Sequence, residues 1–531
     1  MNKTLLLLFF AILLISRTLF SQNINQEWKW AKSYSGSISN RSESVALDND
    51  GNTIIGGNFD DPVFNVGSYT LNRVYNSDAF LVKHDSEGNV IWAKSFGGTG
   101  ADYLKGINTD TLGNIYISGS FDGANINIGG IILTNTSTSY SDIYIAKLNS
   151  SGEIQWAKSM GTNGSDYSYD ITVDRNGNSI ITGGECNSCV SGSSTYWHPY
   201  FIAKYSTNGV LLWKKTADSQ PGANDIGYGI AVDYDCNIYV VGSTNGIAGQ
   251  FMNFGTITVN NPDFFLVKYD SNGNEIWAKG IAGIYGSHSV NIATDKDGGV
   301  YVAGNSQKSP MIFDSIALTF TENQDIFLVK YDQLGNVLWA KHDLPGSIGH
   351  IHCVTTDHQN NILIVGHNGY LDFGTFQLST SNVIFIAKFK SDGVITDLIG
   401  VEGSGVDFAN DVVCDGSKFY LTGNFESQNL SFGNQILYNS NNNPSSNCFL
   451  AKYNFINYNQ FIVYPNPNSG SFTIANKNSI DEIQIFNSYA QLEYSVNPNK
   501  TEHNLNFEKK GVFYVRIKSK DITETKKIII Y

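Results

Sequence analysis

Cysteine is scarce in this chain, with only six residues in 531. Four of them are far apart, at positions 236, 353, 414 and 448, so the chain has no disulfide framework. The other two, Cys186 and Cys189, predict a local disulfide or two free thiols. A metal site there is disfavoured, because it would need two more ligands and His198 is the only obvious one nearby.

Long apolar runs are missing after the first residues. Residues 5–15 are apolar, follow Lys3 and precede the small residue Ser21, so residues 1–22 are predicted to be a secretory signal peptide. No later run is long enough to span a bilayer as a helix. We therefore expect a soluble, exported protein without a transmembrane segment.

Charge is also limited, since charged residues make up 15% of the chain and the net charge is −14. The leader and residues 458–531 each carry a slight excess of basic residues, so the acidic excess lies between them. This distribution argues against nucleic acid or an anionic membrane as a partner. Helical periodicity is absent from the same acidic region.

Two short phrases recur along this region and indicate a repeat architecture. The first is Phe265-Leu-Val-Lys-Tyr269, followed by a Gly-Asn turn and Ile276-Trp-Ala-Lys279. The second is Asp110-Thr-Leu-Gly-Asn114, followed by Ile115-Tyr-Ile-Ser-Gly119. The aromatic that opens the first phrase stands at Phe80, Tyr144, Phe201, Phe265, Phe327, Phe385 and Phe449. The Asp that opens the second phrase stands at Asp48, Asp110, Asp174, Asp233, Asp295, Asp357 and Asp415.

Each phrase predicts a β-hairpin, because a β-prone run leads into a Gly-Asn turn and then into an alternating run. Two hairpins supply the four strands of one propeller blade. The predicted fold class is all-β, a seven-bladed β-propeller of four-stranded blades followed by a small β-sandwich. We expect the Asp-led hairpin on the inner side of each blade. We expect Trp28–Ser33 to pair with Phe449–Tyr453 as the outer strand of the last blade, which closes the ring.

A set of tryptophans recurs in the Trp-Ala-Lys strands, and we expect these side chains to be largely buried between neighbouring blades. Asp397 stands in place of Trp in the last blade, so truncation there should cost little. The tryptophans are Trp30, Trp92, Trp156, Trp213, Trp277 and Trp339.

Two stretches resemble known families. Residues 28–454 resemble the bacterial seven-bladed β-propeller repeat family through Gly97-Gly-Thr-Gly-Ala-Asp-Tyr103 and the strand that ends at Gly119. Residues 461–531 resemble the C-terminal sorting domain of type IX secretion in Bacteroidetes, through Tyr464-Pro-Asn-Pro467, Gly511-Val-Phe-Tyr514 and Lys526-Lys-Ile-Ile-Ile530. The second resemblance implies export to the outer-membrane surface or release, often with removal of this domain, and it implies the type IX machinery as a partner. The first implies no single activity.

These observations divide the chain into a signal peptide (1–22), a propeller (23–457) and a sorting domain (458–531). Repeated carboxylates in the propeller leave alternatives open. The Asp-x-x-Gly-Asn turns could hold calcium, but the Arg in Asp174-Arg-Asn-Gly177 is hard to accept among calcium ligands, which favours ordinary Asx-type turns. Eight residues before each second-phrase Asp lies a further polar set. It could form an acidic ring at the channel mouth or cap Gly-rich loops, and its repetition favours capping. The set is Asn40, Asp102, Asp166, Asp225, Ser287, Gly349 and Asp407.

Catalytic candidates are weaker. The propeller arginines, at positions 41, 73 and 175, are predicted on two opposite faces, so they cannot bind one carboxylate together. His288, His350 and His352 could bind a metal or act as a base. A single histidine per loop without a fixed acidic partner favours a polar surface residue instead.

We therefore predict a non-enzymatic binding or adhesion protein, secreted or on the cell surface, with no cofactor and no metal. We expect it to be a monomer with a glycan or protein ligand. The alternative is a secreted polysaccharide-active enzyme whose site lies on the same loop-rich face. Amphipathic side chains on that face offer flat contact area with a polar tip. The predicted binding residues are Tyr103, Tyr167, Tyr169, Tyr228, Tyr285 and His288.

Overall fold

The computed structural model describes residues 27–34, 36–186, 199–219, 224–244, 251–260, 262–281, 290–306, 309–319, 325–343, 348–374, 376–378, 383–416, 418–439, 445–455, 462–464, 470–519 and 522–530. Every regular element in this part of the chain is a β-strand, and no helix in it could cross a membrane. The chain divides into two compact units, Glu27–Asn454 and a second unit that contains Phe455–Tyr531. The predicted signal peptide lies outside the described residues.

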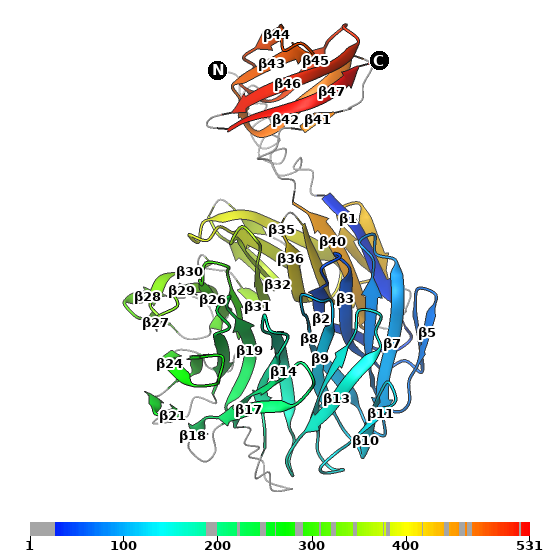
Figure 1. Cartoon of the computed structure of the whole chain (residues 1–531), viewed down its shortest axis with the longest axis vertical. Coiled ribbons are helices and arrows are strands. Elements are labelled where there is room, and N and C mark those ends of the chain that lie inside the picture. Colours follow the sequence, from blue (N-terminus) through cyan, green and yellow to red (C-terminus); the bar gives the residue numbers. More distant parts are fainter. Residues whose placement is uncertain are drawn as a thin grey trace, which may run out of the picture. The chain divides into compact units, whose positions relative to one another are not determined.

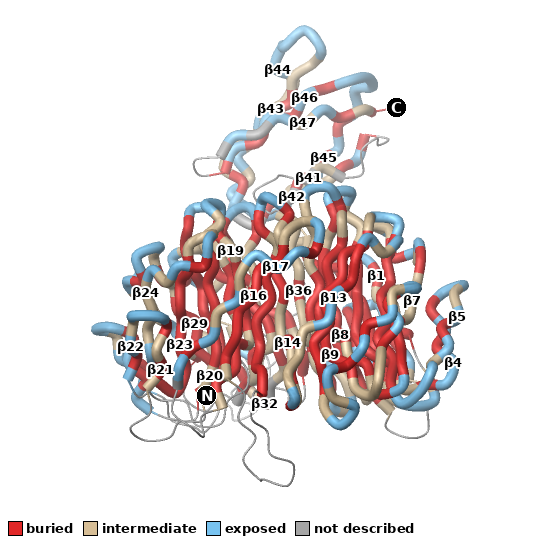
Figure 2. Tube along the Cα trace, turned by 60° about the horizontal axis from the view of Figure 1, so that its bottom comes forward, coloured by how far each residue is buried: buried red, intermediate tan, exposed pale blue. Residues whose placement is uncertain are grey.

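The described strands of Glu27–Asn454 form seven antiparallel four-stranded blades around a central axis (Figure 1). In each blade the strand that leads into the second-phrase Asp is innermost, which confirms the predicted propeller and the inner position of the Asp-led hairpin. The middles of the strands are largely buried, and many of the turns at their ends are exposed (Figure 2). From the innermost strand outward, the blades are β2 (Asn40–Leu47), β3 (Thr53–Phe59), β6 (Asp78–His84) and β7 (Val90–Gly98); β8 (Asp102–Thr109), β9 (Ile115–Phe121), β12 (Asp142–Leu148) and β13 (Ile154–Met160); β14 (Tyr167–Val173), β15 (Ser179–Gly184), β16 (Tyr200–Tyr205) and β17 (Leu211–Thr216); β19 (Ile226–Val232), β20 (Ile238–Ser243), β23 (Phe264–Tyr269) and β24 (Glu275–Ile281); β25 (Val290–Thr294), β26 (Val300–Ser306), β29 (Asp325–Tyr331) and β30 (Val337–His342); β31 (Ile348–Thr356), β32 (Ile362–Asp372), β34 (Val383–Phe389) and β35 (Ile395–Gly403); and β36 (Asp407–Asp415), β37 (Lys418–Phe425), β40 (Asn447–Asn454) and β1 (Glu27–Tyr34).

The seventh blade is completed by the first strand of the propeller. β1 runs antiparallel to β40, with Trp28 opposite Tyr453 and Ser33 opposite Phe449, and the two strands are neighbours in Figure 1. This confirms the predicted closure. Asp397 therefore lies in β35 of the sixth blade and not, as the sequence analysis had it, in the last blade.

Most of the inserted segments between the second and third strands form short hairpins that the sequence analysis did not predict. β10 pairs with the end of β7 in the preceding blade, where a Cβ on Gly98 would lie 1.8 Å from the carbonyl oxygen of Asn125, so only glycine fits there. Alternate apolar side chains such as Phe64 and Phe432 are buried beneath the hairpins. The hairpins thus pack on the outer rim of the blades. Their strands, and the short strands that pair with the same segments, are β4 (Val63–Val66), β5 (Tyr69–Asn72), β10 (Asn125–Ile128), β11 (Ile131–Thr134), β18 (Asp218–Ser219), β21 (Phe251–Phe254), β22 (Ile257–Asn260), β27 (Met311–Phe313), β28 (Ile316–Leu318), β33 (Gln377–Leu378), β38 (Asn429–Phe432) and β39 (Gln435–Tyr438).

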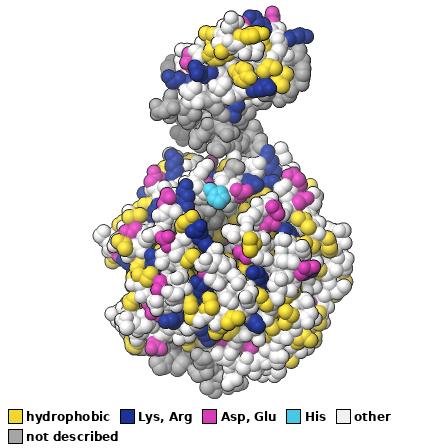
Figure 3. Space-filling view, viewed as in Figure 1, with side chains coloured by type: hydrophobic (Ala, Val, Ile, Leu, Met, Phe, Trp, Pro, Cys, Tyr) yellow, Lys and Arg dark blue, Asp and Glu magenta, His cyan; other side chains and the backbone are white. Residues whose placement is uncertain are grey.

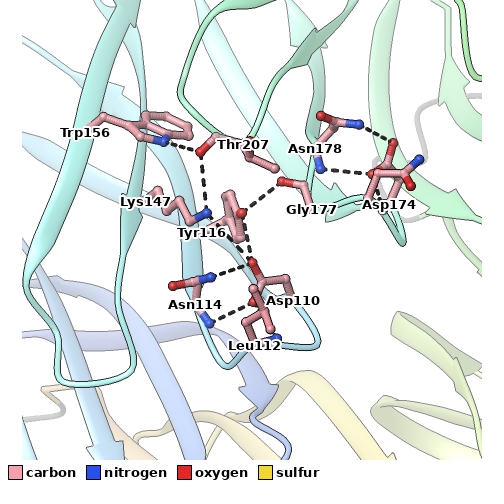
Figure 4. A network of polar contacts seen from close by, with 11 residues as sticks. Asp110, Leu112, Asn114, Tyr116, Lys147, Trp156, Asp174, Gly177, Asn178 and Thr207 are labelled. Atoms are coloured by element: carbon pink, nitrogen blue, oxygen red, sulfur yellow. Dashed lines mark hydrogen bonds and ion pairs between the residues drawn. The ribbon is translucent and has the colours of Figure 1, made fainter.

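A repeated set of contacts, which we call the clamp, joins neighbouring blades at six of the seven junctions, and Figure 4 shows the clamp between the second and third blades. Trp156 of the second blade donates its indole N–H to the carbonyl oxygen of Thr207 in the third blade at 2.9 Å, and Lys147 donates to the same oxygen at 3.4 Å. The indole also packs on Gly209, whose positive φ of 73° belongs to the same turn. Lys147 in addition pairs with Asp110, the second-phrase Asp of its own blade, at 3.9 Å. The other tryptophan and lysine pairs, with the residue whose carbonyl they share, are Trp30 and Lys452 with Ser86, Trp92 and Lys83 with Ser150, Trp213 and Lys204 with Ser271, Trp277 and Lys268 with Gln333, and Trp339 and Lys330 with Ser391.

The clamps confirm that the tryptophans occupy equivalent positions between blades. Trp30, Trp92 and Trp156 are buried, whereas the other three are half-buried and so less enclosed than predicted. The clamps also explain Asp397. A tryptophan at that position would need the turn between the third and fourth strands of the seventh blade. That turn does not exist, because β40 and β1 come from opposite ends of the propeller sequence.

The cysteines agree with the absence of a framework. Cys186 is disulfide-bonded, in accord with the local-disulfide interpretation, although residues 187–198 lie outside the described part of the chain. The scattered cysteines at positions 236, 353, 414 and 448 are free thiols.

The second unit contains two small antiparallel sheets, β41–β42–β45 and β44–β43–β46–β47. Its core includes Phe472, Ile483, Val515 and Ile528, which are buried. The all-β prediction for this region is confirmed. The strands are β41 (Ile462–Tyr464), β42 (Ser471–Ile480), β43 (Glu482–Asn487), β44 (Leu492–Val496), β45 (Lys500–Asn506), β46 (Gly511–Ser519) and β47 (Ile522–Ile530).

Candidate functional site

The innermost strands line a cavity of about 400 Å³ on the axis of the propeller. Six of these strands carry a β-bulge at the same place, five residues before the second-phrase Asp. A bulge leaves one residue without a partner and re-aims its side chain. All six bulged residues line the cavity, and we call them the bulge set: Glu43, Lys105, Tyr169, Tyr228, His352 and Asn410.

Two of the predicted binding residues, Tyr169 and Tyr228, belong to the bulge set. Their rings pack edge to face, with centroids 5.0 Å apart. Tyr103 and Tyr167 lie two residues earlier on β8 and β14, nearer the end of the channel where the chain passes from blade to blade, and both are partly exposed. We call that end the loop mouth and the opposite end, with the Gly-Asn turns, the turn face. The predicted residues Tyr285 and His288 lie outside the described residues.

The charged groups of the cavity wall are engaged within the wall itself. Glu43 and Lys105, bulged residues of neighbouring blades, form an ion pair at 3.3 Å. Asp170 follows the bulge in β14 and accepts the backbone N–H of Ile171 at 2.8 Å and that of Ile230 in the next blade at 2.9 Å. The wall therefore offers polar atoms while its charges contact protein partners.

Asp411 plays the same part in the seventh blade. Its carboxylate accepts the backbone N–H groups of Val412 and of Val45 in the first blade, each at 2.8 Å, as well as the thiol of Cys353 at 3.0 Å. Burial raises the pKa of Asp411, and burial together with the charge of Asp411 raises the pKa of Asp170 to about 7. Both carboxyls thus tie adjacent innermost strands together deep in the channel.

Three histidines of the sixth blade pack into a cluster, and one of them, His352, belongs to the bulge set. The ring of His350 stacks on His367 with centroids 4.8 Å apart, and His352 hydrogen-bonds His367 between ring nitrogens at 2.9 Å. Phe408 of the seventh blade packs edge-on against His367 at 4.6 Å. Burial lowers the pKa of all three, to about 4 for His352 and about 3 for His367. All three rings are thus held neutral, and His352 lines the cavity, so the expectation of polar surface histidines is wrong for His352.

The repeated acids are caps. Asp102 is fully buried and accepts the N–H of Gly98 at 2.7 Å, and Asp407 accepts N–H bonds from the 426–427 loop. Asp166 accepts the N–H groups of Thr162 and Cys186. Their side chains lie in the blades, so the capping interpretation is confirmed and the acidic ring is wrong.

The turn face is uniform. In the turn that starts at Asp48, the carboxylate accepts the N–H groups of Asp50 and Asn52 at 3.0 and 2.9 Å, as an Asx-type turn predicts, and the same bonds recur in later turns. Arg175 on this face stacks on Tyr234 at 3.6 Å. Acidic and basic side chains are interspersed over the propeller surface in Figure 3. Among the described residues, no group of three or more His, Cys, Asp or Glu side chains is placed to hold a metal ion.

Sequence reasoning missed five residues of the site: Glu43, Lys105 and Asn410 in the cavity wall, and His367 and Phe408 in the aromatic cluster that packs behind His352. Four of these lie on innermost strands, at positions five or seven residues before the second-phrase Asp, where the repeats differ most in residue type. This variation between repeats could have identified these four residues from the sequence. His367 lies on the second strand of its blade, and no such pattern marks it.

Two family models match the chain. Residues 219–247 match the beta-propeller repeat, and residues 462–531 match the secretion system C-terminal sorting domain. The chain thus carries propeller repeats and a type IX secretion sorting domain, and it is a protein destined for secretion or the cell surface by that machinery.

Similar proteins are distant. An uncharacterised WD repeat-containing protein of Acanthamoeba polyphaga mimivirus is 24% identical over 470 residues, which is 71% of this chain and 33% of that protein. The chain therefore spans about a third of that relative. Among solved structures, Sqt1 from Chaetomium thermophilum has a TM-score of 0.40 at 8% identity, covering 85% of this chain and 96% of its own. The Pan2 WD40 domain of Neurospora crassa has a TM-score of 0.38 at 10% identity, covering 78% and 89%.

Proposed function

We propose that this protein is a non-enzymatic binding protein, displayed at or released from the cell surface, and that it holds its ligand at the loop mouth of the channel. The observation that carries this proposal is the bulge set. Six strands direct side chains of five different types into one cavity, while the rest of each blade repeats the same contacts. A pocket with convergent polar and aromatic groups is the usual form of a binding site.

The state of the ionisable groups supports binding over catalysis. The carboxyls of Asp170 and Asp411 each accept two backbone N–H bonds, so they act within the wall. His352 is hydrogen-bonded to another histidine, and neither ring is held by a carboxylate in the bonds between described residues. A general base needs a partner that orients it, and it must lie within hydrogen-bond distance of the proton that it removes from the substrate.

The experiment uses the mature chain from residue 23 on printed arrays of glycans and of extracellular proteins. The Tyr103→Ala/Tyr167→Ala variant should lose at least about tenfold in affinity, because both rings stand at the loop mouth. The Asn89→Ala/Asn274→Ala variant, with changes confined to the turn face, should bind as the native chain does. If only the turn-face variant loses binding while both remain folded, the proposed location is wrong.

One observation favours a second candidate, a polysaccharide-active enzyme. Asp170 and Asp411 line the same cavity, and a raised pKa suits a general acid. Release of reducing ends from polysaccharides by the native chain, abolished in Asp170→Asn, would establish this candidate. Absence of release from a broad polysaccharide panel would remove it.

A further inference from the structure

The wall of the cavity is built for contact with a ring. On the side of the third and fourth blades stands the edge-to-face pair of Tyr169 and Tyr228. Across the channel, in the sixth blade, stands His352, and Phe408 of the seventh blade packs behind it with its ring centroid 6.0 Å away. Aromatic rings supply flat apolar area together with polar tips at a small cost in conformational entropy.

The charges of the wall disfavour an ionic ligand. Lys105 is paired with Glu43, and the two aspartates accept backbone N–H bonds while burial raises their pKa and so disfavours the charged carboxylate. A charged ligand would lose its hydration without gaining a free counter-charge, which is costly. Hydroxyl groups face no such penalty, because Asn410, Asn108 and the aspartate carboxyls in the wall can hydrogen-bond with them.

The size of the cavity sets the last limit. Its volume of about 400 Å³ is in the lower part of the range of about 300–1,000 Å³ typical of small-molecule pockets. That space suits one or two small rings and excludes a folded protein segment.

We propose that the ligand is a neutral sugar ring, the free end of a glycan, which enters the loop mouth and lies between the Tyr169–Tyr228 pair and His352 on the opposite side of the channel. This inference rests on the proposed binding function and gives it a ligand class and a pose. The aromatic rings contact the C–H faces of the sugar, and the polar wall groups bind its hydroxyls.

The test is calorimetric titration of the mature chain with free monosaccharides: D-glucose, D-galactose, D-mannose, L-fucose and N-acetyl-D-glucosamine, all neutral, with D-glucosamine and D-glucuronate as charged probes. We expect saturable binding of at least one neutral sugar, with a Kd on the order of 1 mM. The charged probes should bind at least about tenfold more weakly.

Variants locate the site. Tyr228→Ala should weaken the best neutral sugar at least about tenfold. Tyr228→Phe keeps the ring in place and should retain most of the affinity, which guards against a folding defect in the alanine variant. Tyr234→Ala is the matched control, because this tyrosine is 62% exposed on the turn face, and it should bind normally.

The outcomes separate the two proposals. If no neutral sugar binds, if a charged probe binds best, or if Tyr228→Ala is without effect, the sugar inference is wrong. If a ligand on the arrays nevertheless binds the native chain and loses affinity in the Tyr103→Ala/Tyr167→Ala variant, the proposed function stands without the sugar inference. When no printed ligand binds at all, the proposed function fails as well.

Discussion

The clamps and the bulge set each occupy equivalent places in successive blades. The residue types of the clamps are the same from blade to blade, whereas those of the bulge set differ. At the clamps the same tryptophan, lysine and turn carbonyl meet at six junctions in the described structure. In the bulge set the residue changes from acid to base, aromatic, imidazole and amide around one cavity. The first group packs between neighbouring blades, and the second faces the channel.

The difference separates the part of the repeat that joins neighbouring blades from the part that lines the channel, where we propose that a ligand binds. A clamp residue must fit a neighbouring blade of nearly identical shape, so each repeat needs the same side chain. A bulged residue lines the channel, and its contacts, such as the Glu43–Lys105 ion pair and the packing of Tyr169 on Tyr228, differ from blade to blade, so its type can differ as well. Asp397 follows the same rule, because tryptophan is missing at the one junction where its partner turn is missing.

The largest expected effect is on a clamp. Trp156→Ala removes a buried indole and its hydrogen bond to Thr207, and it should lower the free energy of unfolding of the propeller by about 3–5 kcal/mol. Urea denaturation followed by fluorescence measures this loss.

The matched change at the junction without a clamp is Asp397→Ala, which should alter the free energy of unfolding by less than about 1 kcal/mol. Equal losses in the two variants would contradict the role given to the clamp.

A smaller effect is expected in the channel wall. Asp411→Ala leaves the N–H groups of Val45 and Val412 without their acceptor and should cost about 1–3 kcal/mol. Among the described residues, the Asn291 side chain accepts the N–H of its own neighbour Ile292 and no bond from another blade, so Asn291→Ala should cost less. Both residues line the channel, but only Asp411 bonds to a neighbouring blade. Thermal unfolding of both variants therefore tests whether the bond between blades determines the loss of stability.

The sequence predicted the fold further than it predicted the site. Hairpins, blade number and closure follow from short-range turn chemistry and from the two incomplete end repeats, both of which are local signals. The bulges have no such local signal, because the register of pairing between neighbouring strands determines which residue, such as Lys105, is bulged. Tyr169 and Tyr228 were included among the predicted binding residues, whereas His367 reaches the cluster only through the three-dimensional packing of β31, β32 and β36.

The smallest expected effect is a pH dependence. His352 and His367 have pKa values lowered by burial to about 4 and about 3, against 6.5 ordinarily. Their contribution to stability is complete above pH 6.5 and is lost as the pH falls toward 4, because only the unfolded chain binds those protons readily. Relative to His352→Gln/His367→Gln, the native chain should lose stability between pH 6.5 and 4.5 in urea titrations.

Asp102→Asn is the control of opposite sign. Burial raises the pKa of Asp102 to about 8 against 3.8 ordinarily, so its contribution is present at low pH and is lost as the pH rises toward 8. Native chain and variant should therefore diverge in the opposite direction to the histidine variant. A common direction for both would contradict the buried, neutral states assigned to these groups.

The separation of stability from recognition is tested most directly by one parallel alanine scan, which measures the free energy of unfolding and the affinity for the strongest array ligand in the same variants. For Tyr169→Ala, Tyr228→Ala and Asn410→Ala we predict affinity losses of at least about tenfold with unfolding free energies within about 1.5 kcal/mol of the native value. For Trp92→Ala and Trp156→Ala we predict the reverse, a loss of about 3–5 kcal/mol in stability with native affinity in the fraction that remains folded. Bulge variants that lose stability like the clamp variants while binding normally would contradict the account.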